Sequence, residues 1–344
     1  MAEATGETLS RKRPRIDLNL SPVVKYKVPS LHALSLAHHP ALWFDDGDII
    51  LAAGTTAFKV DHAIIKRHSR LLFDIITSMD ARACVEVPVY DVEDTAENVE
   101  TVLKWIYQIN RCRCVRLTMK DCARYLYLGA HYGVDNLKMT AVQCLAETYP
   151  TTLEVYDRLL NTKDPAHKAI PLFDDGDHFV AAFLARHYNL AQILPLVLLI
   201  CRMYGEEDLV KHFEDAVNNL SHIPACVSEE AQIWLLKILT RSRPKIPNPI
   251  IGGDGLVDRQ VCGFPARCYR EISRAHLCPI EVDDEMPLAP FEQRPALLVN
   301  GVCFSCISLW KGVYEQERKK FWEGLPQCFG LASWDELGKD VVAT

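Results

Sequence analysis

Residues 48–60, DIILAAGTTAFKV, contain two short apolar runs, one on each side of a Gly-Thr-Thr turn. Short apolar runs joined by a glycine-containing loop are typical of a β-hairpin. The next stretch, DHAIIKRHSRLLFDIITSM, repeats apolar residues every three and four positions, which predicts helix, and Asp61 is placed to cap its start. This periodicity fits either one helix or two helices with a break near Ser69.

A second alternating stretch follows, and the pattern then becomes helical. ACVEVPVYDV places Val85, Val87 and Val89 on one face, which predicts a third strand. In TAENVETVLKWIYQI, Thr95 is the expected N-cap of a helix with one apolar stripe. LTMKDCARYLYLGAHYGVDNLKMTAVQCLAETY predicts two more helices that are separated at Gly133. A hairpin, helices, a strand and a closing helix pair predict an α+β domain.

The remainder of the chain has the apolar density of packed helices. We expect Pro195 at a helix start and Ser228 at the start of a later helix. A proline-rich run at 244–249 predicts a boundary. The last segment, SLWKGVYEQERKKFWEGL, predicts an amphipathic helix that packs into a core, with partner binding as the alternative role. Its apolar side is predicted to consist of Trp310, Val313, Tyr314, Phe321 and Leu325.

Composition and charge exclude several classes of protein. The 344 residues, 49% of them hydrophobic, can fill the cores of two domains. The net charge of −7 argues against direct nucleic-acid binding, because a phosphate-binding surface needs an excess of Lys and Arg. The N-terminus has no apolar signal region, and the longest apolar run, ILPLVLLI, is too short to cross a bilayer. We therefore expect an intracellular protein, nuclear or cytoplasmic and not secreted, that does not bind a membrane.

The first 38 residues are expected to form a disordered tail that carries a basic cluster. A short run of basic residues on an extended segment is the pattern that nuclear import receptors bind. The alternative is a solvated tail without a targeting role. The residues of this candidate nuclear signal are Arg11, Lys12, Arg13 and Arg15.

The thirteen cysteines of an intracellular protein are expected to be mainly free thiols, with a metal site as the alternative. Near the C-terminus a CFSC motif can supply two corners of a tetrahedral zinc site, since this spacing lets both thiolates reach one ion. Two further ligands are required, and Cys268 with either Cys278 or His276 could supply them; Cys262 also precedes the motif. The candidate ligands of a structural zinc ion are Cys268, Cys278, Cys303 and Cys306. No other cofactor is expected.

Other acidic and histidine residues give weaker signals. FDDGD occurs at 44–48 and at 173–177, but neither copy continues as a calcium-binding loop. We expect the first copy to form a turn before a strand, and Asp175 or Asp177 to cap a helix. His62 could act as an acid or base, but a structural role at the helix start is favoured. Because the sequence assembles no catalytic constellation, we expect a non-enzymatic protein.

Three blocks between residues 42 and 148 follow one another in a recognisable order: DIIL with the helix entry after it, VEVPVYDVEDTAENVETVLKWIYQ, and CARYLYLGAHYGVDNLKMTAVQCL. In spacing and residue type these blocks resemble a BTB/POZ domain. HPALWFDDGDIIL and KFWEGLPQCFGLASWDEL resemble segments of BTB proteins from mushroom-forming fungi. The strand and helix that BTB dimers often exchange cannot be assigned in PSLHALSLAHHPALWF. The residues that match the first block of the family pattern are Asp48, Phe58, His62, Ile65, Ser69 and Phe73.

The resemblance implies a fold and a function. It implies a BTB/POZ fold at 39–149, a small mixed sheet covered by helices, before a mainly α-helical extension at 150–243 and a Cys-containing region at 244–344. Such a protein would bind a protein partner, or a second copy of itself, without being an enzyme. One alternative is a substrate adaptor of a cullin-type ubiquitin ligase. Another is a nuclear transcription regulator with a C-terminal zinc element.

Overall fold

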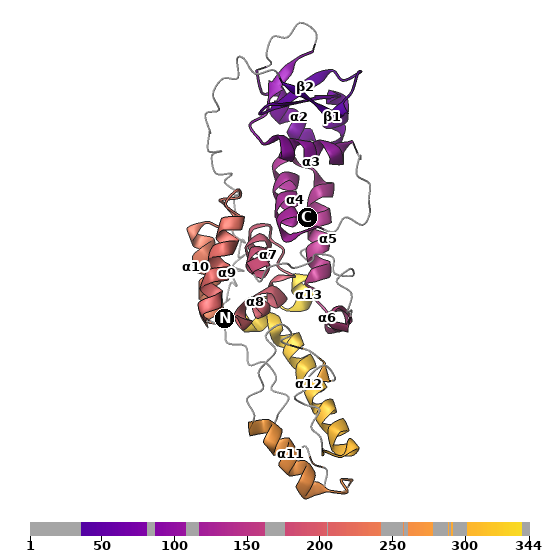
Figure 1. The fold of residues 1–344 in the computed structure, drawn as a ribbon, viewed down its shortest axis with the longest axis vertical. Coiled ribbons are helices and arrows are strands. Elements are labelled where there is room, and N and C mark those ends of the chain that lie inside the picture. Colours follow the sequence, from indigo (N-terminus) through magenta and orange to yellow (C-terminus); the bar gives the residue numbers. More distant parts are fainter. Residues whose placement is uncertain are drawn as a thin grey trace, which may run out of the picture.

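The structure is a computed structural model, in which a small sheet lies at one end of an elongated molecule and helices form the rest (Figure 1). The predicted α+β class is confirmed. The basic cluster of the N-terminal tail lies outside the described residues. The structure describes residues 36–80, 87–107, 117–161, 176–204, 206–241, 257, 261–277, 288, 290–291 and 301–338.

The sheet has four strands in the order β1-β3-β2-β4. They are β1 (Ala37–Trp43), β2 (Ile49–Ala53), β3 (Thr56–Val60) and β4 (Val89–Asp91). β2 and β3 form the predicted antiparallel hairpin. β4 runs parallel to β2 and pairs Val89 with Ile50, so the third predicted strand is confirmed at Val89. Val87 lies at a bend before β4 and not on the strand, and Val85 lies outside the described residues.

The edge strand β1 was not predicted from the sequence. It runs parallel to β3, and its register shifts between His38 and Trp43, whose rings stack with centroids 3.5 Å apart. Pro40 lies within this irregular stretch. Proline is tolerated on edge strands and at bulges, because its missing N–H is not needed for the ladder there. The strand is therefore compatible with a sequence that shows no clean alternation.

Three helices pack on the sheet, α1 (His62–His68), α2 (Arg70–Thr77) and α3 (Ala96–Ile106). Asp61 caps α1, and Thr95 caps α3, as predicted. Ser69 has an extended backbone between α1 and α2, so the alternative with two helices is correct. We call the buried side chains between these helices and the strands the sheet-end core, which includes Leu51, Phe58, Ile65, Ile76, Leu103, Leu128 and Leu137.

An antiparallel helix pair, α4 (Met119–Tyr132) and α5 (Asp135–Thr148), connects the sheet to the rest of the molecule (Figure 1). Gly133 ends α4 at φ 63°, a left-handed conformation that glycine adopts without steric cost. Leu128 and Leu137 belong to the sheet-end core, whereas Leu126 and Leu145 are buried on the other side of the pair. The pair thus contributes to two cores.

The second of these, the central core, is built mainly from helices of the extension. These helices are α6 (Leu153–Asn161), α7 (Gly176–His187), α8 (Leu194–Met203), α9 (Glu206–Asn219) and α10 (Glu229–Arg241). The central core includes Leu126, Leu145, Phe183, Leu198, Leu235 and Leu325. Pro195 lies in the first turn of α8, and Ser228 Oγ accepts a hydrogen bond from Ala231 N at 3.3 Å, so both predicted helix starts are confirmed.

The second FDDGD copy leads into α7. Asp177 lies inside that helix, which begins at Gly176, so it is not the predicted N-cap. It lies in the first turn, where a negative charge still suits the positive end of the helix. Asp175, the other predicted cap, lies outside the described residues.

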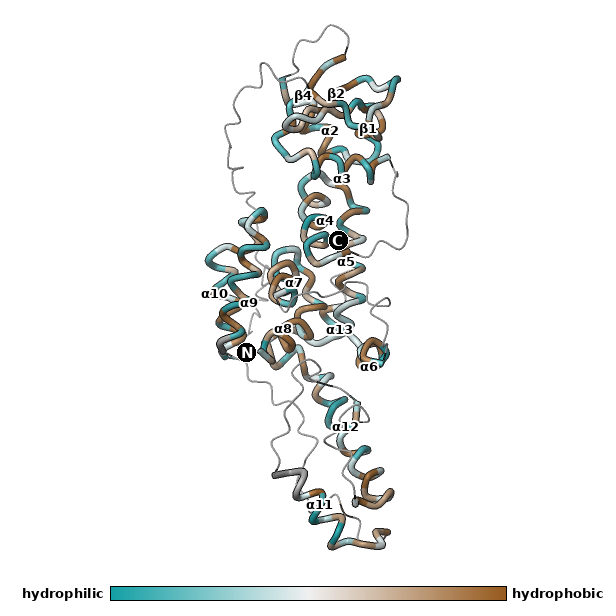
Figure 2. Tube along the Cα trace, viewed as in Figure 1, coloured by the Kyte–Doolittle hydropathy of each residue, from teal (hydrophilic) through white to brown (hydrophobic). Residues whose placement is uncertain are grey.

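Hydropathy separates α8 from the other helices. Figure 2 shows hydrophobic residues around most of α8, and seven of its ten residues are buried. A helix that is apolar all round lies inside a core, which is where the structure places α8. None of the described helices combines the length and the apolar character that a membrane span requires.

The long helix α12 (Phe304–Cys328) joins the central core to a third core. Trp310, Tyr314 and Leu325 of the predicted stripe are buried, and Val313 and Phe321 are partly buried, so core packing of this helix is confirmed. The third core also contains α11 (Pro265–Leu277). We call it the thiol-end core, and it consists of Cys262, Cys268, Ile272, Phe291, Val302, Cys306, Trp310 and Tyr314. A short helix, α13 (Trp334–Leu337), follows α12.

A buried arginine fixes the middle of α12 to the extension. Arg318 is 1% exposed, and its Nε donates a hydrogen bond to the Leu288 carbonyl oxygen at 2.8 Å. Its Nη1 donates to Asp157 Oδ2 on α6 at 3.1 Å and to Glu315 Oε2 at 2.9 Å. A buried charge is costly unless it is paired in this way. This ion-pair network was not predicted from the sequence.

Candidate functional site

The six residues of the first pattern block, Asp48, Phe58, His62, Ile65, Ser69 and Phe73, lie around the start of α1 and in the core beneath it. Asp48 Oδ1 accepts a hydrogen bond from His62 N at 2.8 Å, and the second carboxylate oxygen of Asp48 contacts His62 Nδ1. Burial alone would raise the pKa of Asp48, but the hydrogen bonds from His62 outweigh it and lower the pKa below its usual value. The pair joins the hairpin to α1. The His62 side chain is half exposed, and its contacts fit the structural role that we expected.

The other pattern residues join α1 and α2 to the core. Phe58 and Ile65 are completely buried. Ser69 is 2% exposed, its Oγ accepts from Leu72 N at 2.9 Å, and it donates to the Tyr132 carbonyl oxygen at the end of α4. Phe73, the sixth residue of the pattern, lies under Lys66 Nζ, which is 4.9 Å from the ring centroid. These contacts position elements and do not assemble reacting groups.

Asp48, Asp61 and His62 also lie close enough together to be considered as metal ligands. Asp61 Oδ1 already accepts hydrogen bonds from Ala63 N at 2.7 Å and from Ile64 N at 3.1 Å. Asp48 is held by His62, as described above. Helix capping and pairing account for these side chains, and the first FDDGD copy has the turn and strand-entry role that we expected.

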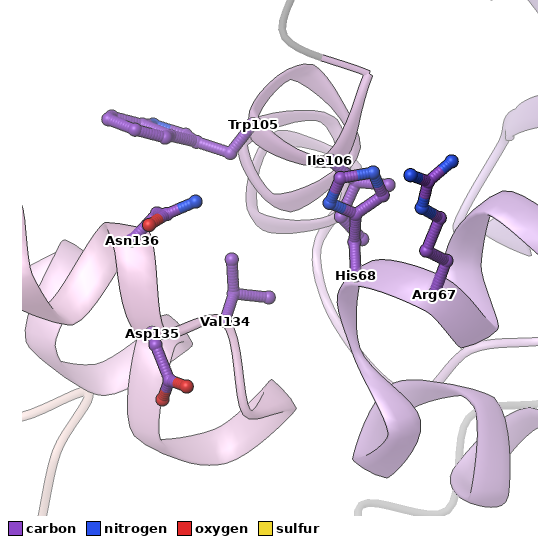
Figure 3. A pocket seen from close by; sticks show the side chains of 7 residues that line it. All are labelled: Arg67, His68, Trp105, Ile106, Val134, Asp135 and Asn136. Atoms are coloured by element: carbon purple, nitrogen blue, oxygen red, sulfur yellow. The ribbon is translucent and has the colours of Figure 1, made fainter.

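A small pocket lies between α1, α3 and the start of α5 (Figure 3). Figure 3 shows His68 and Arg67 on one side of the pocket, and Trp105 and Asn136 on the other. Its volume is about 180 Å³. Pockets for organic ligands usually measure roughly 300–1,000 Å³, so this one is too small for a typical cofactor. The complete lining is Arg67, His68, Trp105, Ile106, Val134, Asp135 and Asn136.

The strongest candidate site is a cluster of four cysteines at the other end of the molecule. Cys303 is the N-cap of α12 and Cys306 lies in its first turn. Cys268 lies in α11, and Cys262 lies just before that helix. Their four sulfur atoms lie within 4.8 Å of one another, and Cys262 Sγ is 3.6 Å from Cys303 Sγ.

Three of the four predicted metal ligands therefore come together, and Cys262 takes the fourth position. Cys278, which the sequence suggested for that position, lies outside the described residues. Cys262 was noted upstream of the motif but was not selected. Gly263 and Pro265 separate it from Cys268, and such residues indicate a turn that brings the chain back at the start of α11. This turn is the feature of the sequence from which Cys262 could have been identified as the fourth cysteine of the cluster.

Three of the thiols have shifted pKa values. The nearby backbone N–H of Cys306 lowers the pKa of the Cys303 thiol to about 7. Burial raises the pKa of Cys268 and of Cys306. A thiol of lowered pKa at a helix N-terminus is suited to metal binding, because a metal ion binds the thiolate form.

Comparisons of the chain with known protein families, with curated proteins and with solved structures find no match.

Proposed function

We propose that the chain is a non-enzymatic protein-interaction protein that acts through a BTB/POZ-type domain at 39–149, by self-association or by recruiting a protein partner. The observation that carries this proposal is the order of elements around the linked pattern residues. The chain forms a hairpin and then a helix pair that is separated at Ser69. A strand parallel to β2, a capped helix and a closing helix pair follow. This order agrees with the one that the resemblance implies.

Exposed apolar side chains on the helices of this domain support a contact surface. Leu71 on α2 is 46% exposed and Met139 on α5 is 60% exposed. Association becomes more favourable when it removes apolar groups on helix faces from water. The Leu71 side chain lies beside Gly133 on one side, and nearly half of it remains exposed for association. We therefore place Leu71 in the proposed association surface.

Light scattering on the purified full-length chain tests the proposal. We expect a mass of twice 38.9 kDa, or a mass that rises with concentration, and a Leu71→Asp variant that shifts toward the monomer. Arg70→Ala, at the neighbouring exposed position of the same helix, is the control and should leave the mass unchanged. A pull-down with mass spectrometry detects recruitment of another protein. A monomer at all concentrations that captures no Leu71-dependent partner would contradict the proposal.

We also propose that the protein accumulates in the nucleus. The basic cluster of the tail supports nuclear accumulation, because import receptors bind such charge on extended segments. A fluorescent fusion with Lys12→Ala and Arg13→Ala should lose nuclear accumulation, whereas a fusion with Lys25→Ala and Lys27→Ala should keep it. Equal distributions of the two variants would remove the nuclear assignment.

A further inference from the structure

The thiol-end core is small and lies away from the bulk of the protein. Figure 1 shows α11 and the start of α12 extending from the central helices, at the end opposite to the sheet. Three of the eight buried residues of this core are cysteines, Cys262, Cys268 and Cys306. A small unit with few apolar side chains usually needs a cross-link or a metal to remain ordered. We therefore considered whether the cysteines provide such a cross-link or metal site.

The distances between the sulfur atoms fit a tetrahedral metal site. Zinc–sulfur bonds of about 2.3 Å place the four sulfurs of a tetrahedron about 3.8 Å apart. Here all four lie within 4.8 Å of one another, and the pair Cys262 and Cys303 is 3.6 Å apart. Two disulfides would need only pairwise contacts, at an S–S distance of about 2.05 Å. Convergence of all four sulfurs is explained better by one shared ion.

The backbone around the cysteines favours negatively charged sulfur. Cys303 N donates a hydrogen bond to Cys268 Sγ at 3.2 Å. Cys303 and Cys306 lie at the N-terminal end of a helix of 25 residues, where the partial positive charge stabilises a thiolate. Such hydrogen bonds from the surrounding backbone orient metal ligands and tune their basicity.

The turn before Cys303 is adapted to close approach. Gly301 has φ 112°, a conformation that other residues rarely adopt. A Cβ atom at this position would lie 3.3 Å from Arg267 Nη2, next to Cys268 in the chain. The glycine therefore lets the chain pass close to α11 immediately before it enters α12, which brings the two pairs of cysteines together.

We propose that Cys262, Cys268, Cys303 and Cys306 bind one zinc ion that holds the start of α11 to the start of α12. Four soft thiolate ligands in tetrahedral arrangement select zinc or an iron–sulfur centre over harder cations. Four protein ligands leave no open coordination position, so the ion is structural and not catalytic. Each thiol that binds as a thiolate gives up its proton to solvent, so up to four protons are released for each Zn²⁺ bound. This inference does not depend on the proposed BTB-type function.

Metal analysis of the full-length protein, purified under reducing conditions without chelators, is the first test. We expect one zinc per chain. After removal of the zinc, addition of Co²⁺ should produce the sulfur-to-cobalt charge-transfer and ligand-field absorption of a tetrahedral thiolate site. Iron in place of zinc, or a reduced protein that contains neither metal and gives no such Co²⁺ spectrum, would overturn the proposal.

Single substitutions test the ligand set. Cys262→Ser and Cys303→Ser should each reduce the zinc content from one per chain toward zero and change the Co²⁺ spectrum. Cys328→Ser, on the same helix but exposed, is the matched control and should retain full zinc. Cys278→Ser should also retain it. If Cys278→Ser loses zinc while Cys262→Ser keeps it, the proposed ligand set is wrong.

A variant that fails to fold would lose zinc for another reason, so helical content must be measured beside the metal. Because the sheet-end and central cores lie elsewhere, we expect Cys262→Ser to retain most of the far-ultraviolet circular dichroism of the full-length chain. Intact-mass analysis of unmodified protein gives a further check. A disulfide between any two of the four cysteines in freshly reduced, metal-exposed protein would contradict zinc binding.

Discussion

The two ends of this molecule are held together in different ways. The sheet-end core joins strands and helices through apolar side chains such as Phe58, Ile65 and Leu103, which are completely buried. The thiol-end core has eight buried residues, and three of them are cysteines in place of larger apolar side chains. Burial of apolar surface can stabilise the first end without help. The second end has too little such surface, so a local cross-link has the larger role there.

The largest effect should come from removing a ligand at the thiol end. Structural zinc contributes about 10–16 kcal/mol of apparent binding free energy in zinc-finger peptides, so loss of a ligand should unfold the segment that depends on it. In limited proteolysis, we expect Cys306→Ser to be cut rapidly within 261–277, while 36–80 remains intact. The exposed Cys328→Ser variant should be digested like the unmodified protein. Equal cutting of both ends would contradict the difference between them.

The next largest effect concerns the connection between the thiol end and the centre. Arg318→Ala removes the cation between Asp157 and Glu315 and the donor to the Leu288 carbonyl oxygen. Breaking a buried ion pair costs about 3–5 kcal/mol, and we expect the low end of this range because the two carboxylates are 29% and 31% exposed. Urea unfolding should show this destabilisation. Lys320→Ala removes an exposed ion pair with Glu317 and should cost at most about 1 kcal/mol. Similar losses in the two variants would show that burial of Arg318 does not matter.

A smaller effect is expected at the sheet end from Ser69→Ala. The substitution leaves the Tyr132 carbonyl oxygen without its donor and removes the N-cap of α2, which together should cost about 1–3 kcal/mol. Ser78→Ala is a control because this serine is exposed at the end of the same helix. The unfolding midpoint of Ser69→Ala should fall clearly below that of Ser78→Ala. An unchanged midpoint would refute the structural role of Ser69.

The smallest effect is a pH dependence from Asp48. Burial alone would raise the pKa of Asp48, but the hydrogen bonds from His62 hold it below its usual value of 3.8, so the folded state prefers the charged form. The resulting stability is present above pH 3.8 and is lost as the pH falls through the folded pKa. Because the side chain is partly exposed, the contribution should stay within about 1 kcal/mol. Asp48→Asn should lower the stability near neutral pH, and its difference from the unmodified protein should shrink as the pH falls below 3.8. A difference that does not change with pH would contradict this.

Much of the sheet end could be predicted because its signals are local. Caps at Asp61 and Thr95, and the turn residue Gly133, act within a few positions of the chain, so periodicity and residue type were sufficient. β1 could not be predicted in the same way. Its pairing with β3 is a long-range contact, and Pro40 together with the shifted register removes the alternation that marks a strand.

At the thiol end, local sequence signals were not sufficient to predict the contacts. The CFSC motif identified Cys303 and Cys306, but the remaining ligands depend on where α11 lies relative to α12. Spacing alone could not decide between Cys262 and Cys278. Arg318 was missed for a related reason. It lies four residues after Tyr314 on the buried side of α12, and a charged residue in such a position gives a signal only when its partner on α6 is known.

Hydrogen exchange of the full-length protein, measured with zinc bound and after zinc removal, tests the difference between the two ends most directly. We expect zinc removal to increase amide exchange strongly in α11 and in the first turns of α12, and to leave β2, β3 and α3 unchanged. Unchanged exchange in α11 after complete removal of the metal would contradict a structural role of zinc. Loss of protection at both ends together would show that the sheet end also depends on the thiol cluster.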